Sequence, residues 1–409
     1  MNAAVGPIPA AGAAFDWALD AAPDGTPLAG RVADAAGWLP TLRSSGDEEQ
    51  DETLFTRLVA LCDRRGAPAF SSGWKPDRIG RALRGLADAW GLDEPSHALR
   101  CLAALAPGRL KDVSFPEWDA DSGPGFLSDP AALGLLRTDW GRTADAIALA
   151  WPDGGSVLEL RANGRRLISG EWGLEVAIDG EPLDLAAGWD CVCRHADEDG
   201  GFLELQWCGE SGAGAVTVER QAFLSRDGSF ALLSDAVRLE EKSVEALIEY
   251  DAKLPLSAGV SGGVAPGGAE ARLFSGKKNW QRARLFPLGA AASDGGLDTA
   301  SMTVDVEAVL LQARSRGGLV APLAFDWNRW REDDPADWRA LTVTENRRRL
   351  EAAQAGAHRL RIGEEHQLLT YRRTDRSVAP RAVLGHHHDH ETLIATLNRK
   401  GEVTPLLKV

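Results

Sequence analysis

The feature that most constrains this chain is a series of short apolar segments, separated at near-regular intervals by turn-forming dipeptides. Between residues 139 and 239 the segments read AIALAW, SVLELRA, RRLIS, WGLEVAI, WDCVCRH, FLELQWC, VTVERQAFL and FALLSDAV. Asn163-Gly164, Asp179-Gly180 and Asp227-Gly228 lie between segments and supply the positive φ angles of tight hairpin turns. Several segments alternate apolar and polar residues, as half-buried strands do. We therefore predict antiparallel strands joined by hairpins, with Asn163-Gly164 as a two-residue turn.

Segments of the same kind continue beyond residue 239, with no long helix between them. They include the predicted strands ARLFS (271–275), HRLRI (358–362) and HQLLTYRR (366–373). They end in a predicted hairpin of residues 392–398 and 402–409 around Arg399-Lys400-Gly401. So many strands need more than one sheet to bury their apolar faces. The sequence therefore predicts a mainly β protein: a large multi-strand antiparallel β-sandwich of the supersandwich kind, preceded by a small α-helical region.

The N-terminal part of the chain has a different pattern. Residues 1–46 are rich in Ala, Gly and Pro with weak periodicity, which predicts a loosely ordered extension. Helical periodicity and capping residues in 47–110 predict a small helical region, and we expect any protein partner to dock there. Residues 111–138 contain Gly and Pro and are predicted to be a connector to the antiparallel β-sandwich of residues 139–409.

Charge and cysteine content restrict the partners and the compartment. The formal net charge of the 409 residues is −15, which argues against nucleic acid and against anionic lipid, because both bind clustered basic residues. The five cysteines form no disulfide-like framework, and the sequence has no run of ~18 apolar residues that could span a bilayer. The N-terminus lacks a secretory pattern, so we predict a cytoplasmic protein without a membrane partner.

Part of the strand series resembles a known family. Residues 156–170, SVLELRANGRRLISG, resemble the first hairpin of the β-sandwich domain in heparinase II/III-like proteins, where a strand ending Phe-Glu-Leu, an Ala-x-Gly-Arg turn and a Leu-Leu strand follow one another. Residues 218–228, VERQAFLSRDG, and 232–237, LLSDAV, resemble later strands of that domain. The resemblance covers residues 139–240 and implies a multi-sheet β-sandwich with a polysaccharide ligand.

The chain departs from this family at the residues that the family's lyases use for catalysis. The family's lyases have a His-x-His-Ala-Asp run directly before the first hairpin, whereas residues 150–155 here read AWPDGG. Polysaccharide lyases need a base, an acid and a group that neutralises the uronate carboxylate. The resemblance therefore implies the sandwich fold and a carbohydrate-associated role without the usual lyase residues.

Tryptophan is unusually frequent, with 14 Trp against 2 Tyr. An indole face is an apolar platform on which a sugar ring can stack, and its N–H adds a polar edge. Trp172, Trp189 and Trp207 lie at or within predicted strands, and we assign them as candidate carbohydrate-binding residues. The alternative is that they fill the sandwich core, as large aromatic residues usually do.

The densest group of potential metal ligands is the run HHHDHE at residues 386–391. In an extended segment His386, His388 and His390 share one face. Alternate Cα atoms in a strand lie roughly 6.7 Å apart, so a zinc site would need a turn or a further ligand. The alternative is a polar loop that leads into the final hairpin. We predict no cofactor, with zinc at these three histidines as the alternative.

Cys191, Cys193 and His195 also alternate onto one strand face, with Cys193 predicted opposite Glu204. Two thiols can share a metal, but buried thiols that act as small hydrophobic residues are the simpler interpretation. Arginine groups at residues 347–349 and 372–373 can line a groove for an acidic sugar or lie on solvated sheet faces.

These observations leave three functional hypotheses. The leading one is a heparinase II/III-like sandwich protein that lacks the usual lyase residues and acts as a carbohydrate-associated binding or accessory module. The first alternative is an active lyase on uronate-containing polymers, with Tyr250 as base, His195 as its partner and an arginine as carboxylate neutraliser. The second is a structural or protein-interaction module that docks through its N-terminal helical region.

Overall fold

The protein is built from antiparallel β-sheets. The structure, a computed structural model, describes residues 60–62, 69–70, 125–128, 132–139, 143–151, 155–239, 245–264, 270–290, 299–351 and 353–409. Strands dominate this part of the chain and pair antiparallel, so the predicted mainly β fold of several antiparallel sheets is confirmed. The chain divides into two compact units, Met1–Glu171 and Trp172–Val409.

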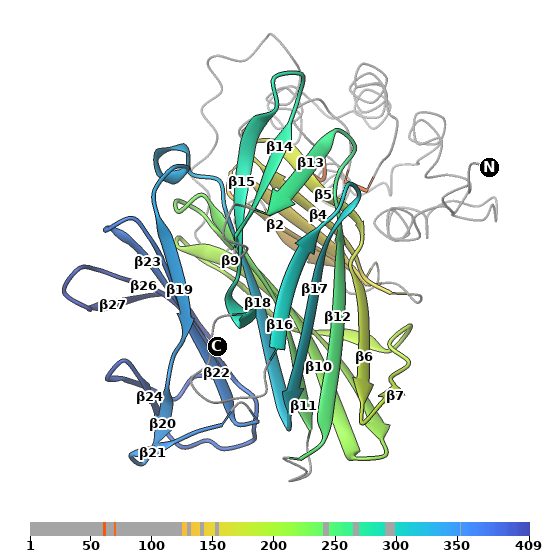
Figure 1. The fold of residues 1–409 in the computed structure, drawn as a ribbon, viewed down its shortest axis with the longest axis vertical. Helices are drawn as coiled ribbons and strands as arrows, with labels where there is room; N and C mark the ends of the chain where they lie inside the picture. Colours follow the sequence, from red (N-terminus) through yellow and green to blue (C-terminus); the bar gives the residue numbers. More distant parts are fainter. Residues whose placement is uncertain are drawn as a thin grey trace, which may run out of the picture. The chain divides into compact units, whose positions relative to one another are not determined.

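The described part of the first unit contains a five-stranded meander (Figure 1). Its strands neighbour one another in chain order: β1 (Phe126–Ser128), β2 (Leu133–Arg137), β3 (Ala146–Ala150), β4 (Val157–Ala162) and β5 (Arg165–Glu171). β2, β3 and β4 are buried along their whole length, including the charged side chains of Arg137, Glu159 and Arg161. β1 and β2 lie within residues 111–138, which were predicted as a connector. The prediction missed these strands because Gly and Pro lie around the short apolar run LGLLR.

Buried charged side chains of this meander hold two preceding pieces of chain. Arg137 Nη1 donates to the carbonyl oxygens of Ala60 at 2.7 Å and Cys62 at 3.1 Å. Glu159 accepts a hydrogen bond of 2.9 Å from the backbone N–H of Phe70. These contacts give buried backbone groups the partners that they need away from water.

The predicted extension, residues 1–46, and most of the predicted helical region, 47–110, lie outside the described residues. The part of the chain that the structure describes contains no helix long and apolar enough to cross a membrane.

The second unit contains four antiparallel sheets, which we name by a strand of each. The central sheet has the order β13-β14-β15-β18-β11-β10-β9-β8, the β12 sheet β16-β17-β12-β6-β7, the β23 sheet β19-β22-β23-β26-β27 and the β24 sheet β21-β20-β24-β25. The bounds are β6 (Gly173–Ile178), β7 (Glu181–Pro182), β8 (Trp189–Ala196), β9 (Gly200–Ser211), β10 (Gly214–Ser225), β11 (Phe230–Leu239), β12 (Leu247–Pro255), β13 (Val260–Val264), β14 (Ala271–Ser275), β15 (Trp280–Pro287), η3 (Leu288–Ala290), β16 (Thr299–Val304), β17 (Ala308–Arg316), β18 (Gly318–Asp326), η4 (Arg329–Arg331), β19 (Ala336–Ala340), β20 (Val343–Glu345), β21 (Arg348–Arg349), β22 (Ala355–Ile362), β23 (His366–Arg373), β24 (Arg381–Val383), β25 (His386–His388), β26 (Thr392–Leu397) and β27 (Val403–Lys408).

The central sheet lies between the β12 sheet and the β23 sheet. On β11, Leu232 belongs to a core shared with the β23 sheet, whereas Asp235 faces the other way and accepts a hydrogen bond from Tyr250 of the β12 sheet. On β10, Phe223 and Arg220 divide between the two faces in the same way. Period-two alternation therefore sends neighbouring residues of one strand into different layers.

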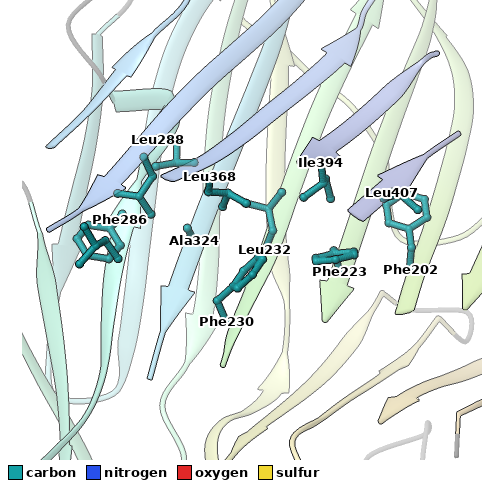
Figure 2. Packing of buried hydrophobic residues seen from close by; sticks show 12 residues of the cluster. Phe202, Phe223, Phe230, Leu232, Phe286, Leu288, Ala324, Leu368, Ile394 and Leu407 are labelled. Carbon is teal, nitrogen blue, oxygen red and sulfur yellow. The ribbon is translucent and has the colours of Figure 1, made fainter. Parts of the chain in front are cut away.

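Two apolar cores pack the β23 sheet against the central sheet on one face and against the β24 sheet on the other. Figure 2 shows the core between the central and β23 sheets, in which aromatic rings from β9, β10, β11 and β15 meet aliphatic side chains of β23, β26 and β27. A second core lies between the β23 and β24 sheets and includes Val343, Val383, Leu369, Tyr371 and Leu393. The β23 sheet is therefore buried on both faces, which explains why HQLLTYRR carries so few exposed residues.

Two of the three predicted dipeptide turns have positive φ angles, whereas at Asp227-Gly228 the positive φ lies on the next residue, Ser229, at 54°. Asn163 and Gly164 have φ angles of 51° and 65°, and Ala162 pairs with Arg165 across them. Asp179 and Gly180 have φ angles of 52° and 83°. Both pairs have the two successive left-handed residues of a type I′ turn.

Candidate functional site

The second unit contains a cavity of about 640 Å³. It is enclosed by β17, the start of β18, the start of β22 and the connection from β19 to β20. Apolar side chains of its wall include Leu311, Leu319, Pro322, Leu341 and Val343. Polar ones include Arg314, Ser315, Arg316, Arg349, Glu351 and His358. A cavity of this size, with an apolar wall and a few polar groups, has the dimensions of a small-molecule site.

His358 is a buried titratable group of this wall. It follows Ala357, which faces the β24 sheet, so alternation turns the imidazole to the opposite side of β22. The residue is 7% exposed, and its Nδ1 makes no hydrogen bond within the part of the chain that the structure describes. Burial lowers its pKa to about 4. The ring is therefore neutral near pH 7, and its Nδ1 is a buried polar atom without a partner among the described residues.

Tyr250 also lines the cavity, and its hydroxyl is hydrogen-bonded to a neighbouring carboxylate. The hydroxyl donates to Asp235 Oδ2 at 2.8 Å, and Arg220 Nε donates to Asp235 Oδ1 at 3.0 Å. Burial, followed by the charge of Asp235, raises the pKa of Tyr250 well above its usual value. The phenol therefore stays protonated and is unsuited to act as a base.

Positive charge is in excess at the cavity. Its ionised side chains, among the described residues, are the guanidinium groups of Arg314, Arg316 and Arg349 and the carboxylate of Glu351. Arg314 pairs with Glu249 at 2.8 Å on the exposed side of β17, whereas Arg349 lies exposed on β21. In a chain of net charge −15, such a local excess attracts anions to one place on the surface.

The residues proposed for a lyase do not come together. His195 lies on β8 at the edge of the central sheet, where its Nε2 is 2.8 Å from Asp197 Oδ2. Tyr250 lies on β12 in a different sheet, and His195 is not part of the cavity wall. The geometry thus gives Tyr250 neither the partner nor the ionisation that the lyase alternative needs.

The three tryptophans assigned to carbohydrate binding are buried. Trp172, Trp189 and Trp207 are 3%, 7% and 8% exposed. The guanidinium of Arg220 covers the ring of Trp172 at 4.2 Å, and Trp189 Nε1 donates to the carbonyl of Leu185. The structure therefore corrects the predicted stacking platform, because a sugar cannot reach rings whose faces are packed against protein.

The histidine run forms a strand, β25, paired with β24. As predicted for an extended segment, His386, His388 and His390 share one face, with ring centroids 6.2 and 6.1 Å apart. The rings are stacked, and no group of three or more potential ligands in the described ranges is arranged to hold a metal ion. The alternative of a polar loop is corrected as well, because His388 is buried against Tyr371.

Cys193 pairs with Glu204 across β8 and β9, as predicted. A register shift between Cys191 and Cys193 interrupts the alternation, and Cys191 Sγ donates to the carbonyl of Cys193 at 3.6 Å. Burial, and then the charge of Glu204, raises the pKa of the Cys193 thiol. The thiol therefore stays protonated, which suits a small packed residue and not a nucleophile.

Sequence reasoning missed His358 as a site residue. The segment HRLRI was predicted as a strand, and its alternation places His358 with Leu360 and Ile362 on the apolar face. The sequence signal that could have identified His358 is a titratable residue on an otherwise apolar strand face. Such a residue must either find a hydrogen-bond partner or line a cavity. The cavity itself is formed by strands far apart in sequence, which no local pattern predicts.

The fold and the cavity define a class: a layered, antiparallel β protein with a half-open, ligand-sized cavity. No family model matches the sequence, and no curated protein matches it. Among solved structures, a protein of Escherichia coli K12 assigned provisionally as an aldose 1-epimerase is similar at a TM-score of 0.32, with 10% identity over 48% of this chain and 100% of that one. The Slr1438 protein of Synechocystis sp. PCC 6803 is similar at a TM-score of 0.29, with 10% identity over 53% of this chain and 99% of that one. Similarities of this strength identify neither a family nor an activity.

Proposed function

We propose that this protein is a carbohydrate-binding or accessory protein, that its ligand site is the cavity lined by His358, and that its preferred ligand carries a carboxylate. The observation that carries the proposal is the cavity itself, whose largely apolar wall includes the neutral imidazole of His358 together with arginine side chains. A sugar hydroxyl both donates and accepts, so it satisfies a neutral imidazole in either tautomer. The apolar wall suits the C–H face of a pyranose ring, and about 640 Å³ accommodates one or a few rings.

The charges around the cavity support an acidic sugar over a neutral one. With Arg314 paired to Glu249, Arg316 and Arg349 still outnumber the one carboxylate of the wall, Glu351. Arginine binds a carboxylate with two parallel hydrogen bonds, which adds orientation as well as attraction. This excess also fits the heparinase II/III resemblance, in which a carbohydrate role remains although the lyase residues are absent.

Calorimetric titration of the full chain tests the proposal. Oligomers of galacturonate and glucuronate are compared with the matching oligomers of galactose and glucose, and we expect tighter binding of the acidic set. Arg349→Gln should raise Kd about tenfold, because a charge-assisted hydrogen bond contributes roughly 1.5–3 kcal/mol. Arg339→Gln, an exposed arginine outside the cavity wall, is the matched control and should leave Kd unchanged.

Two results contradict the proposal. Absence of binding to every sugar removes the carbohydrate role itself. Growth of ultraviolet absorbance in mixtures with uronate oligomers, from unsaturated products, would make the protein a lyase instead of a binding protein.

A further inference from the structure

Two tryptophans of the second unit are exposed, unlike the buried ones described above. Trp330 on η4 is 93% exposed and Trp280, the first residue of β15, is 59% exposed. Large aromatic side chains are mostly buried, and leaving one in water forgoes the stabilisation that its burial would give. An exposed indole on a well-held segment is therefore a feature that stability alone does not explain.

The segment that presents Trp330 is held by several hydrogen bonds. Asn328 caps η4, and its side chain accepts from the backbone N–H of Trp330 at 2.9 Å. Arg331 pairs with the buried carboxylate of Asp326 at 2.7 Å and donates to the carbonyl of Gly228 at 2.7 Å. The backbone on both sides of the indole is thus anchored while the ring itself remains in solvent. Such a ring loses little conformational freedom when it binds.

The same contacts place the two tryptophans on neighbouring segments. Arg284 of β15 donates to the carbonyl oxygens of Arg331 and Asp334, both at 2.8 Å. Gln281, the residue after Trp280, donates to the carbonyl of Glu332 at 3.4 Å. The start of β15 and the turn of η4 therefore lie side by side, each with one exposed indole. Neither tryptophan lines the cavity.

The surroundings of the two indoles are polar and carry charges of both signs, with Glu332 and Asp333 directly after η4 and basic residues before each indole. Lys277, Lys278 and Asn279 form the exposed tip of the β14–β15 hairpin directly before Trp280, and Arg329 is exposed directly before Trp330. A protein interface needs a contiguous apolar centre surrounded by a polar rim. Separate indoles, each beside hydrogen-bond donors, fit a chain of sugar rings, which offers apolar ring faces and polar edges in alternation.

We propose that Trp280 and Trp330 form a stacking surface for the pyranose rings of an acidic glycan chain, as a second carbohydrate site separate from the cavity. Each indole stacks on one ring, and the lysines and Arg329 attract the carboxylates or sulfates of the chain. The surface is formed by Trp280, Trp330 and the basic residues beside them, so binding there does not depend on His358. It gives affinity that grows with the length of the glycan, because two separated rings must be bound together.

Titration of the full chain with acidic oligosaccharides of two, four and six rings tests this surface. The hexamer should bind more tightly than the dimer to the native chain. The double variant Trp280→Ala with Trp330→Ala should raise Kd for the hexamer about tenfold, while binding of the dimer in the cavity is unchanged. Trp330→Phe keeps an aromatic face and should restore part of the affinity. Val378→Ala, at a site 88% exposed elsewhere in the unit, is the control for removal of an exposed apolar side chain.

The outcomes separate this proposal from the cavity proposal. Equal affinity of the double variant and the native chain for the hexamer overturns the stacking surface, whatever the cavity binds. Arg349→Gln tests the cavity alone. It should weaken binding of the two-ring oligosaccharide, while the affinity should still rise with the length of the glycan. Sedimentation of the native chain and of the double variant tests whether a second copy of the chain covers the two tryptophans instead. A dimer of the native chain that the double variant does not form would assign them to self-association and overturn the glycan site.

Discussion

Tyr250 lies at the centre of a buried hydrogen-bonded group that joins two layers of the second unit. Its hydroxyl donates to Asp235, which also binds Arg220, and the Arg220 guanidinium lies against the ring of Trp172. A charge buried with a full set of partners is stable, but one left with an unmet oxygen is costly. The group therefore has a structural role at the floor of the cavity.

Tyr250→Phe should lower the free energy of unfolding by about 1–3 kcal/mol, because Asp235 Oδ2 then loses a donor that no water replaces. Urea denaturation followed by tryptophan fluorescence measures the change. Val306→Ala, at a residue 86% exposed, is the control and should leave the midpoint in place. An unchanged midpoint for Tyr250→Phe would mean that the hydroxyl is not part of a buried network.

Prediction from sequence succeeds for single residues when the property is local. Alternation correctly placed Cys193 opposite Glu204 and set His386, His388 and His390 on one face. The assignment of Trp172, Trp189 and Trp207 to carbohydrate binding was wrong, and the alternative that they fill the core is confirmed. A surplus of Trp does not state which rings another sheet covers. Exposure at Trp330 depends on a turn anchored by β15, β18 and the connection between β10 and β11, so no local pattern predicts it.

At the scale of elements, hairpin turns and buried ion pairs determine which strands stay together. The Asn163-Gly164 turn uses two left-handed residues, which only a few residue types accept. Gly164→Val should lower the free energy of unfolding by at least about 1–2 kcal/mol, since a branched side chain strains that backbone. Gly263→Val is the matched control, because its Cβ would meet open space. Equal melting temperatures for the two variants would contradict the turn.

A buried ion group joins the central sheet to the β23 sheet. Arg372 Nη2 lies 2.7 Å from Glu204 Oε1 and 2.6 Å from Glu219 Oε2, and Arg372 Nη1 donates to Thr392 at 2.6 Å. Burial raises the pKa of Glu204 despite the nearby arginine. Glu204 thus depends on a cation from another sheet, and Glu219 shares that cation while also lying 3.6 Å from Arg238 Nη2 of β11.

Arg372→Met should destabilise the protein by about 3–5 kcal/mol, because it leaves two carboxylates buried with too little positive charge. Adding Glu204→Gln and Glu219→Gln to that variant should recover part of the loss, since neutral amides need no counter-charge. Denaturant titration of the single and triple variants gives the comparison. A triple variant less stable than Arg372→Met alone would show that the charges themselves are favourable.

The strands were predictable wherever turn chemistry bounded an apolar run. Residues 271–275 and 366–373 were predicted with the bounds that the structure gives to β14 and β23. β13 was missed because Gly262 and Gly263 give it the composition of a loop, and β25 because three histidines give it no apolar face. The missing information is the neighbouring strand, which supplies backbone partners to a segment without its own pattern.

At the scale of the whole molecule, neutral buried histidines make stability depend on pH. Burial lowers the pKa of His358 to about 4 and of His366 to about 3. Burial, with the charges of His390, His386 and Arg373, lowers the pKa of His388 to about 4. The unfolded chain binds protons near its ordinary pKa of about 6.5, so these residues give their full stability above pH ~6.5 and lose it as the pH falls toward their folded values.

Unfolding free energy should therefore fall between about pH 7.5 and about pH 5, by up to about 2 kcal/mol for His358 alone. Urea midpoints at constant ionic strength measure it. His358→Gln should flatten part of this slope, whereas substitution of the exposed His387 by Gln should not. A slope that survives intact in His358→Gln would mean that its imidazole is protonated in the folded protein.

The order of strands in the central sheet could not be predicted from the sequence. β18 lies between β11 and β15, although β12 to β17 intervene along the chain between β11 and β18. Local turn signals predict only neighbours joined by hairpins, such as β9, β10 and β11. The long-range insertion depends on which apolar faces fit together, and it also forms the wall of the cavity.

The late position of β18 has a consequence for the protein during its synthesis. β10 and β11 pair with each other as soon as residue 239 has left the ribosome, yet the other edge of β11 has no partner until residues 318–326 arrive. For nearly ninety residues of translation, an almost wholly buried strand presents open backbone donors and acceptors, and such an edge recruits strands from other chains. A transcript truncated before codon 318 would therefore yield a product that aggregates rather than a smaller soluble sheet.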